Sequence, residues 1–380
     1  MITPFIFGKL AFGSEFTNRN QELFRLNQNF QGGVNTIIIS PRRWGKSSLV
    51  KKAAEEAGKK KSNLVFCFLD LYNTRSEEEF YRYLAQEVIK STSSKWEERL
   101  SFTRKFISRF IPSVTYSPEP NNEFSLSLNY KELMKSPDEI LNLAENIAAA
   151  KKVHLILCID EFQQIADFKE TKAFQRKLRA AFQTQRHVTY CLYGSKRSMM
   201  MHVFTAVSMP FYKFGDIIFL QKISENDWKK FLVDRFAQTG KKITEQQAVM
   251  ISSMVENHPY YVQQLAQLSW LRSGKSCTNK IIVEAFESLT LQLSMLFQNL
   301  TDSLSPKQVN FLAALGDESQ KFSSREMLEK YRLGTSANVL KIKYALQQKE
   351  IIDIDGGKIE FLDPVYKNWL NNYYFKRVSQ

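Results

Sequence analysis

Cysteines, long apolar runs and acidic residues are all scarce in this 380-residue sequence. The four cysteines form no CxxC pair and lack the spacing of metal ligands, so neither a zinc site nor a disulfide framework is predicted. We expect buried, reduced thiols at Cys67, Cys158, Cys191 and Cys277. No apolar run approaches the roughly 20 residues that span a membrane, and the N-terminus MITPFIFG does not resemble a signal peptide. These absences predict a cytoplasmic globular protein.

The shortage of acids leaves a formal net charge of +14, from 53 basic and 39 acidic residues. Residues 41–62 carry eight Lys or Arg against two acids, and residues 169–197 carry eight against Glu170 alone. Residues 299–380 are nearly balanced, with twelve against ten. The basic excess therefore lies in the N-terminal half, where it favours contact with polyanions such as nucleic acid or nucleotide phosphates.

Apolar runs that alternate with helical periodicity predict an α/β fold through about residue 220. Strands are expected at residues 35–39, 64–70, 153–159 and 188–193, and helices at residues 20–30, 46–57 and 76–90. Near-continuous apolar strands separated by helices are typical of a parallel sheet covered on both faces. Residues 112–130 contain three prolines and then alternate in polarity, which predicts an inserted β-hairpin.

The pattern becomes helical after Ser224, with amphipathic segments at residues 225–238, 244–255, 259–271 and 279–298. The block 304–370 changes character again. It predicts helices that begin at Ser305, at a capping box in residues 323–326 and at Thr335, followed by a hairpin over residues 351–361. Three helices and a hairpin are the elements of a winged helix.

Residues 40–47 read SPRRWGKS between a predicted strand and a predicted helix, which is the arrangement of a phosphate-binding loop (P-loop). Backbone N–H groups of such a loop point at phosphates, and a glycine allows close approach. Lys46 is expected to reach the β- and γ-phosphates of ATP, and the Ser47 hydroxyl to bind Mg²⁺. The predicted binding residues are Ser40, Pro41, Arg42, Arg43, Trp44, Gly45, Lys46, Ser47 and Ser48.

The same spacing recurs at residues 269–276, SWLRSGKS, with the same serine in place of the first glycine. This second segment follows a predicted helix and has no strand before it. We interpret it as a helix end near Gly274 and not as a binding loop, because the P-loop motif needs its strand–loop–helix setting.

Residues 155–161, LILCIDE, form an apolar strand that ends in two acids. Paired with a P-loop, this pattern predicts Asp160 as a holder of Mg²⁺ and Glu161 as the base that activates the attacking water. Ser195 follows the next strand, where a polar side chain can contact the γ-phosphate or the water. A plain strand-to-helix turn is the alternative for Ser195.

Taken in order, these motifs resemble those of the archaeal-type ATPases, a branch related to the AAA+ and STAND NTPases. The matching segments are FTNRNQEL at 16–23, PRRWGKSS at 41–48, IDEFQ at 159–163, GS at 194–195, PFY at 210–212, HPYY at 258–261 and DPVYKNWL at 363–370. The resemblance implies a P-loop NTPase core with an AAA+-like parallel sheet and an inserted hairpin, then a helical lid and a winged helix. The implied domains are 1–222, 223–298 and 299–380.

The resemblance also adds Arg19, His258 and Pro259 to the predicted nucleotide-binding residues, His258 and Pro259 through a lid motif that contacts nucleotide in STAND relatives. Here Asn257 replaces a glycine of that lid motif, and Asn18 and Ser40 replace glycines of the two N-terminal motifs. No arginine finger is evident from the sequence; Lys213 is the nearest cation after the PFY segment, and Arg197 is an alternative.

Two surfaces are predicted to meet partners. Asn338, Lys341 and Lys343 on the third winged-helix segment are placed to meet DNA, although many winged helices dock protein instead. Lys172, Arg176 and Arg179 share one face of a predicted helix, opposite an apolar stripe. This basic face is either a solvated helix back or a surface for an anionic partner, which would be nucleic acid or a neighbouring subunit's nucleotide.

Three functions remain open from the sequence. The first is an ATPase that acts as a nucleotide-driven switch. The second is a DNA-binding regulator in which ATP sets the conformation, and the third is a scaffold that binds ATP with little turnover.

Overall fold

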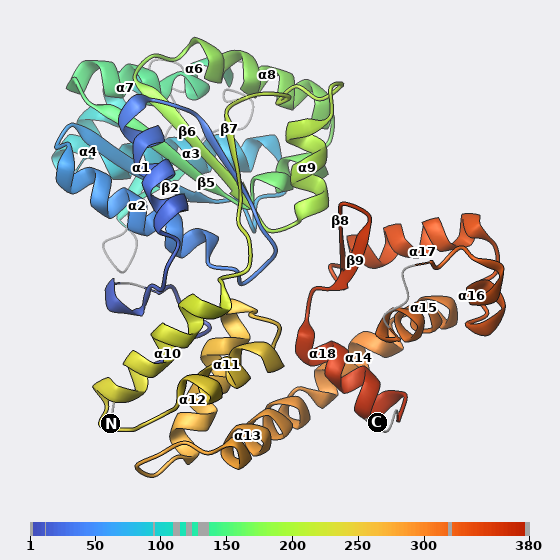
Figure 1. Ribbon diagram of the computed structural model, residues 1–380. Helices are drawn as coiled ribbons and strands as arrows, with labels where there is room; N and C mark the ends of the chain where they lie inside the picture. Colours follow the sequence, from blue (N-terminus) through green and yellow to red (C-terminus); the bar gives the residue numbers. More distant parts are fainter. Residues whose placement is uncertain are drawn as a thin grey trace. The chain divides into compact units, whose positions relative to one another are not determined.

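The computed structural model describes residues 3–11, 13–93, 96–108, 115–118, 124–127, 137–317 and 321–376 (Figure 1). The chain divides into two compact units, which we describe separately. One is Arg19–Gln221, and the other joins Met1–Asn18 to Lys222–Gln380. The three-domain division at residues 222 and 298 stays a prediction.

The first unit is built on a five-stranded sheet in which every pairing is parallel, as predicted. Its spatial order is β2-β5-β6-β1-β7. The strands are β1 (Thr36–Ile39), β2 (Leu64–Asp70), β5 (His154–Asp160), β6 (Val188–Gly194) and β7 (Asp216–Phe219). The sequence did not predict β7, because a four-residue run at a sheet edge gives too short a signal.

Helices cover both faces of this sheet (Figure 1). They are α1 (Asn20–Gly32), α2 (Lys46–Lys60), α3 (Glu77–Thr92), α4 (Trp96–Phe102), α6 (Pro137–Leu141), α7 (Leu143–Lys151), α8 (Thr171–Thr184) and α9 (Arg197–Thr205). Alternation along β2 shows the two faces: the ring of Phe66 lies 5.3 Å from that of Phe30 on α1, while Cys67 belongs to the core formed with α3 and α7. All four cysteines are buried free thiols, as expected.

The predicted hairpin is confirmed as the antiparallel pair β3 (Thr115–Pro118) and β4 (Phe124–Ser127). The rest of the predicted range 112–130 lies outside the described residues. Short helical turns also occur at η1 (Gly13–Glu15), η2 (Thr103–Ile107) and η3 (Phe162–Asp167). Among the described residues, no helix combines the length and the apolar character needed to cross a membrane.

The second unit begins with helices α10 (Glu225–Gln238), α11 (Glu245–Met254), α12 (Pro259–Arg272), α13 (Asn279–Gln292) and α14 (Ser294–Asp302). The single helix predicted over 279–298 is two helices that meet at Leu293. The N-terminal segment packs on these helices: Phe5 is buried and its ring lies 5.6 Å from that of Phe236. This contact could not be predicted, because a single apolar residue in a loop has no periodicity.

The winged helix consists of α15 (Pro306–Gly316), α16 (Arg325–Lys330), α17 (Ser336–Gln348), β8 (Ile352–Asp355), β9 (Lys358–Phe361) and α18 (Pro364–Trp369), followed by η4 (Leu370–Tyr374). Gly356 and Gly357 both have positive φ in the β8–β9 turn, which explains the glycine pair. One expectation was wrong. The cap of α16 is Ser324, whose hydroxyl accepts the Met327 N–H, so the Ser323–Glu326 capping box does not form.

Candidate active site

Three adjacent strands of the first unit end at one edge of the sheet. Ser40 follows β1, Asp160 ends β5 and Ser195 follows β6. The register pairs Ile39 with Gly194 and Ile159 with Leu192, so the carboxyl ends of these strands lie together. Sites in open parallel sheets form at such an edge. The structure therefore brings together the three segments that the sequence singled out.

The loop between β1 and α2 presents the N-terminal end of a helix. Arg43 and Gly45 have φ of 62° and 88°, in the left-handed region. Gly45 is the N-cap of α2, offers no side-chain acceptor to the first-turn amides, and is followed by no acid in that turn. The partial positive charge of the helix end is therefore available for an anion.

The serine that replaces the first glycine of the loop fits the structure. Ser40 is fully buried, and its hydroxyl donates to the Pro41 carbonyl at 3.2 Å. The side chain is satisfied within the loop itself, so the departure from the motif leaves no unpaired hydroxyl.

Arg19 holds the backbone of this loop through hydrogen bonds. Its guanidinium donates to the carbonyls of Trp44 at 3.1 Å and Gln221 at 2.6 Å, and pairs with Glu22 at 3.1 Å. Burial lowers the pKa of Arg19, and Glu22 partly offsets that effect. The structure thus places Arg19, only 5% exposed, against the backbone of the loop.

Lys46 and Ser47, the first two residues of α2, face the acids at the end of β5. The Lys46 ammonium lies 3.8 Å from Asp160 and 3.4 Å from Glu161. The Ser47 hydroxyl donates to Asp160 Oδ2 at 2.7 Å. The four residues predicted from two distant motifs therefore form one cluster.

The two neighbouring acids differ in their electrostatic settings. Burial raises the pKa of Asp160, and Lys46 and Ser47 offset this only in part. Burial alone would also raise the pKa of Glu161, but Lys46, Gln163 and Ser195 outweigh it, so its pKa falls below the usual value. Both Asp160 and Glu161 retain a stabilising cation in Lys46.

Ser195 and Gln163 complete the surroundings of Glu161. The Ser195 hydroxyl donates to Glu161 Oε2 at 2.8 Å and its N–H to the same atom at 3.4 Å. The Gln163 amide also donates to Glu161 Oε2. Sequence reasoning found Ser195 and missed Gln163, although the letters IDEFQ contained the signal of a polar residue two positions after the acid pair.

His258 and Pro259 lie in the second unit, where they begin α12. His258 is its N-cap and Pro259 its first residue. The His258 ring lies 5.0 Å from that of Tyr261. A contact between His258 or Pro259 and nucleotide stays a prediction. The two cations considered as arginine fingers lie in the first unit: Arg197 begins α9, and Lys213 adopts a left-handed conformation with φ of 53°.

The three cations predicted to share a basic face on α8 have different surroundings. Lys172 and Arg176 are exposed, while Phe174, Leu178 and Phe182 are buried on the opposite side, as predicted. Arg179 differs from the prediction. Its guanidinium donates to the Pro210 carbonyl at 3.2 Å and lies 4.7 Å from the centre of the Phe214 ring, so it is part of the packing of the first unit.

The start of α12 is tied to the start of α18 within the second unit. The Tyr261 hydroxyl donates to Asp363 at 2.5 Å, and Asp363 caps α18 by accepting the N–H groups of Val365 and Tyr366. Glu256, just before α12, pairs with Lys367 at 2.9 Å and with Lys222 at 3.5 Å.

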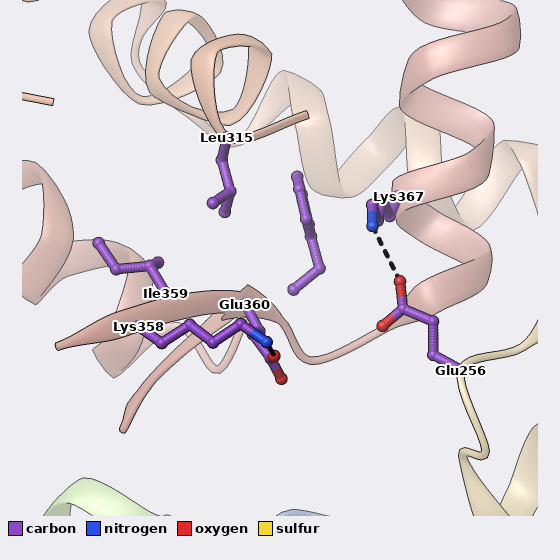
Figure 2. A pocket seen from close by; sticks show the side chains of 7 residues that line it. Glu256, Leu315, Lys358, Ile359, Glu360 and Lys367 are labelled. Carbon is purple, nitrogen blue, oxygen red and sulfur yellow. Dashed lines mark hydrogen bonds and ion pairs between the residues drawn. The ribbon is translucent and has the colours of Figure 1, made fainter. Parts of the chain in front are cut away.

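Figure 2 shows the Glu256–Lys367 pair beside a cavity of about 410 Å³. The cavity is lined by Glu256, Leu315, Lys358, Ile359, Glu360, Phe361 and Lys367. Its lining therefore combines the α11–α12 loop with α15, β9 and α18 of the winged helix.

Together, the parallel sheet, the strand–loop–helix and the acidic strand end define the class of P-loop ATPases with an AAA+-type core. The chain belongs to the family of ATPase domains predominantly from Archaea, whose family model matches residues 16–265. A second family model, for a winged helix domain, matches residues 295–372. No curated protein sequence gave a significant match.

Solved structures with the same fold are similar to this chain at low identity. The Walker-type ATPase of Pyrococcus abyssi is 16% identical with a TM-score of 0.67, over 97% of this chain and 99% of that one. The ORC1 protein of Aeropyrum pernix, solved in complex with DNA, is 10% identical with a TM-score of 0.50, over 96% of this chain and 94% of that one. At these identities the likeness concerns the fold.

Proposed function

We propose that the chain binds ATP with Mg²⁺ at the loop of residues 40–48 and hydrolyses it slowly, as a switch that acts on the winged helix. One observation carries the proposal: Lys46 and Ser47 at the start of a helix meet Asp160 and Glu161 at the end of a strand. A cation and a hydroxyl beside two acids are the groups that phosphoryl transfer requires.

The phosphates of ATP fit the helix end on electrostatic grounds. The α2 N-terminus has no acid in its first turn, and Arg43 and Gly45 turn the loop backbone through left-handed conformations. Lys46 now pairs with Asp160 and Glu161 and would exchange these contacts for the β- and γ-phosphates. A lysine already held among acids makes that exchange without entering an apolar environment.

The residues present fit Mg²⁺. The Ser47 hydroxyl and the Asp160 carboxylate are oxygen donors only 2.7 Å apart, and Mg²⁺ prefers few protein oxygens together with phosphate oxygens. Ser47 and Asp160 would hold the ion, which supplies neutralisation of phosphate charge when bound. Asp160 would do so with or without an intervening water.

Glu161 is the proposed general base. It adjoins Asp160, and a carboxylate at this strand end can accept a proton from the attacking water. Ser195 holds the carboxylate through two donors, so the proposal gives it a supporting part in turnover. Neither Lys213 nor Arg197 is assigned as an arginine finger, and slow hydrolysis follows if none is supplied.

The switch rests on the contacts within the second unit. His258 and Pro259 are proposed to contact the nucleotide, and three residues later Tyr261 bonds to Asp363, the cap of α18. Glu256 makes a second tie to Lys367. A shift of the α12 start when nucleotide binds would therefore be passed to the winged helix.

The direct test is multiple-turnover phosphate release from Mg-ATP by the full chain, with Glu161→Gln alongside. Turnover in the wild type and its loss in the variant, with ATP binding retained in both, are the expected results. Binding without turnover in the wild type would replace the ATPase with the ATP-binding scaffold, and absence of binding would refute the site.

DNA binding through the winged helix is the second candidate, favoured by the fold and by the exposed Lys341. The other features of α17 suit it less well. Leu340 and Tyr344 are 68% and 66% exposed, and the Lys343 ammonium lies over the Phe322 ring at 5.3 Å. A salt-dependent shift of duplex DNA that is lost in Lys341→Glu would support this alternative.

A further inference from the structure

The two oxygens of the Glu161 carboxylate have different surroundings. Oε2 accepts hydrogen bonds from Gln163 Nε2 and from the hydroxyl and N–H of Ser195. Oε1 lies 3.4 Å from Lys46 Nζ. If Lys46 turns to phosphate, Oε1 becomes the oxygen available to water, while the donors on Oε2 keep the carboxylate in place.

The position of Gln163 allows its amide to hold Glu161 Oε2. Gln163 lies in η3, two residues after Glu161, and its side chain is fully buried. Its Nε2 donates to Glu161, whereas its Oε1 is buried with no hydrogen-bond partner among the described residues. An unpaired buried amide oxygen costs stability. The glutamine is therefore poorly explained by packing alone, and its donor is the group with a clear use.

Gly194 makes room for this amide. A Cβ at position 194 would lie 1.9 Å from Gln163 Oε1, 3.1 Å from its Cδ and 2.9 Å from Met200 Sδ. Gly194 is outside the left-handed region, so the glycine supplies space and not backbone freedom. The position of the Gln163 amide beside the Glu161 carboxylate therefore requires glycine at position 194.

We propose that Gln163 is a positioning residue for hydrolysis, which holds Glu161 Oε2 so that Oε1 faces the attacking water. Gly194 is the residue that permits this pose. The inference rests on the proposed function, since it concerns the base of the same reaction. It does not involve binding of the nucleotide, because the loop of residues 40–48 and the Mg²⁺ ligands are left intact.

The test compares Gln163→Leu, which keeps the size and removes the donor, with wild type. Turnover number should fall about ten- to hundredfold, as small misplacements of a catalytic group do, while the Kd for Mg-ATP stays unchanged and the midpoint of thermal unfolding does not fall. The neighbour Gln164 offers a matched control, because its amide donates to the Tyr72 carbonyl and not to Glu161. Gln164→Leu should retain wild-type turnover.

A double-mutant cycle adds a second readout that general loss of packing would not reproduce. Gly194→Ala should slow turnover by displacing the amide, and Gln163→Ala by removing it. Because both act through the same hydrogen bond, the double variant should be no slower than the slower single variant. Multiplied effects would show two separate roles and overturn the pairing.

The outcomes separate this inference from the function on which it rests. If Gln163→Leu turns over ATP as fast as the wild type does, Gln163 has no positioning role, and the proposed ATPase activity is unaffected. A parallel loss of ATP binding or thermal stability in Gln163→Leu makes the residue structural. A wild type without turnover refutes the proposed ATPase itself, and the inference falls with it.

Discussion

The sequence contains the spacing SxxxxGKS twice, and the two copies have opposite structures. Residues 40–47 lie between β1 and α2, so Lys46 begins a helix. Residues 269–276 run out of the end of α12, where Ser273 is the C-cap and its hydroxyl donates to the Ser269 carbonyl at 2.7 Å. The second lysine, Lys275, is exposed, and its carbonyl accepts the Lys242 N–H at 2.9 Å.

The difference shows that the backbone around the motif decides its chemistry. The first copy presents the N–H groups of a helix start to the site, and the second presents the carbonyls of a helix end. Helix ends carry partial charges of opposite sign, so the start of α2 suits a phosphate and the end of α12 suits a cation. The end of α12 has such a cation in Lys241, whose ammonium donates to the Trp270 and Ser273 carbonyls at 2.6 and 2.7 Å. The first copy alone has the acids of β5 beside its lysine.

The largest difference between the two copies is expected at their lysines. Lys46→Ala should abolish tight ATP binding, with a loss of about 3–5 kcal/mol, because it removes the cation that would meet the β- and γ-phosphates. Lys275→Ala is the matched control and should bind as wild type does. Calorimetric titration of Mg-ATP measures both. Equal affinity in all three proteins would show that neither copy is the site.

The next largest effect is expected at the acid Glu161, which only the first copy has beside its lysine. Glu161→Gln should keep ATP bound and reduce phosphate release by a factor on the order of 10²–10⁴, because it preserves shape and removes the base. The measurement is single-turnover hydrolysis together with Kd. Unchanged hydrolysis in Glu161→Gln would assign the base elsewhere.

Much of this site could be predicted because apolar strands that end in polar residues place them at one edge of a parallel sheet. Asp160, Glu161 and Ser195 were found in that way. Gln163 was not, because the polar residue after the acid pair gives no sign of its fit against Gly194, which joins η3 to the end of β6. Two other contacts could not be predicted for the same reason. They are the hydrogen bond from Arg19 to the Trp44 carbonyl and the packing of Phe5 against Phe236, which join segments distant in the sequence and leave no local pattern.

The two glycines of the repeated motif provide a smaller effect. Gly45 has φ of 88°, which an alanine adopts at a cost of about 1–2 kcal/mol, whereas Gly274 is in an ordinary conformation with open space around its Cα. In Gly45→Ala the empty loop can relax from this strain and must regain it to hold phosphate, so ATP binding should weaken about tenfold. Gly274→Ala should bind as wild type does. Calorimetry measures the Kd of both variants. The midpoint of thermal unfolding is measured as well, because strain that unfolded the loop would lower that midpoint. A Gly45→Ala variant with wild-type affinity would contradict the left-handed loop.

The three cations of α8 also differ in their surroundings, and we expect their substitution to have the smallest effects on stability and binding. Arg179→Glu should lower stability by about 1–2 kcal/mol, because it removes the bond to Pro210 and the contact with Phe214. Lys172→Glu and Arg176→Glu should leave stability and ATP binding near wild type, and reduce binding to an anionic partner such as duplex DNA at low salt. Chemical denaturation and a DNA titration separate the two classes. Equal destabilisation by all three substitutions would remove the distinction.

The most direct measurement of the central claim is a crystal structure of the protein with a non-hydrolysable ATP analogue and Mg²⁺. We expect the terminal phosphates against the amides of residues 43–48, with Lys46 turned from Glu161 to the phosphates and Mg²⁺ held by Ser47 and Asp160. We expect no phosphate beside residues 273–276. A nucleotide bound at another place, with Lys46 still paired to Asp160 and Glu161, would contradict the proposed site.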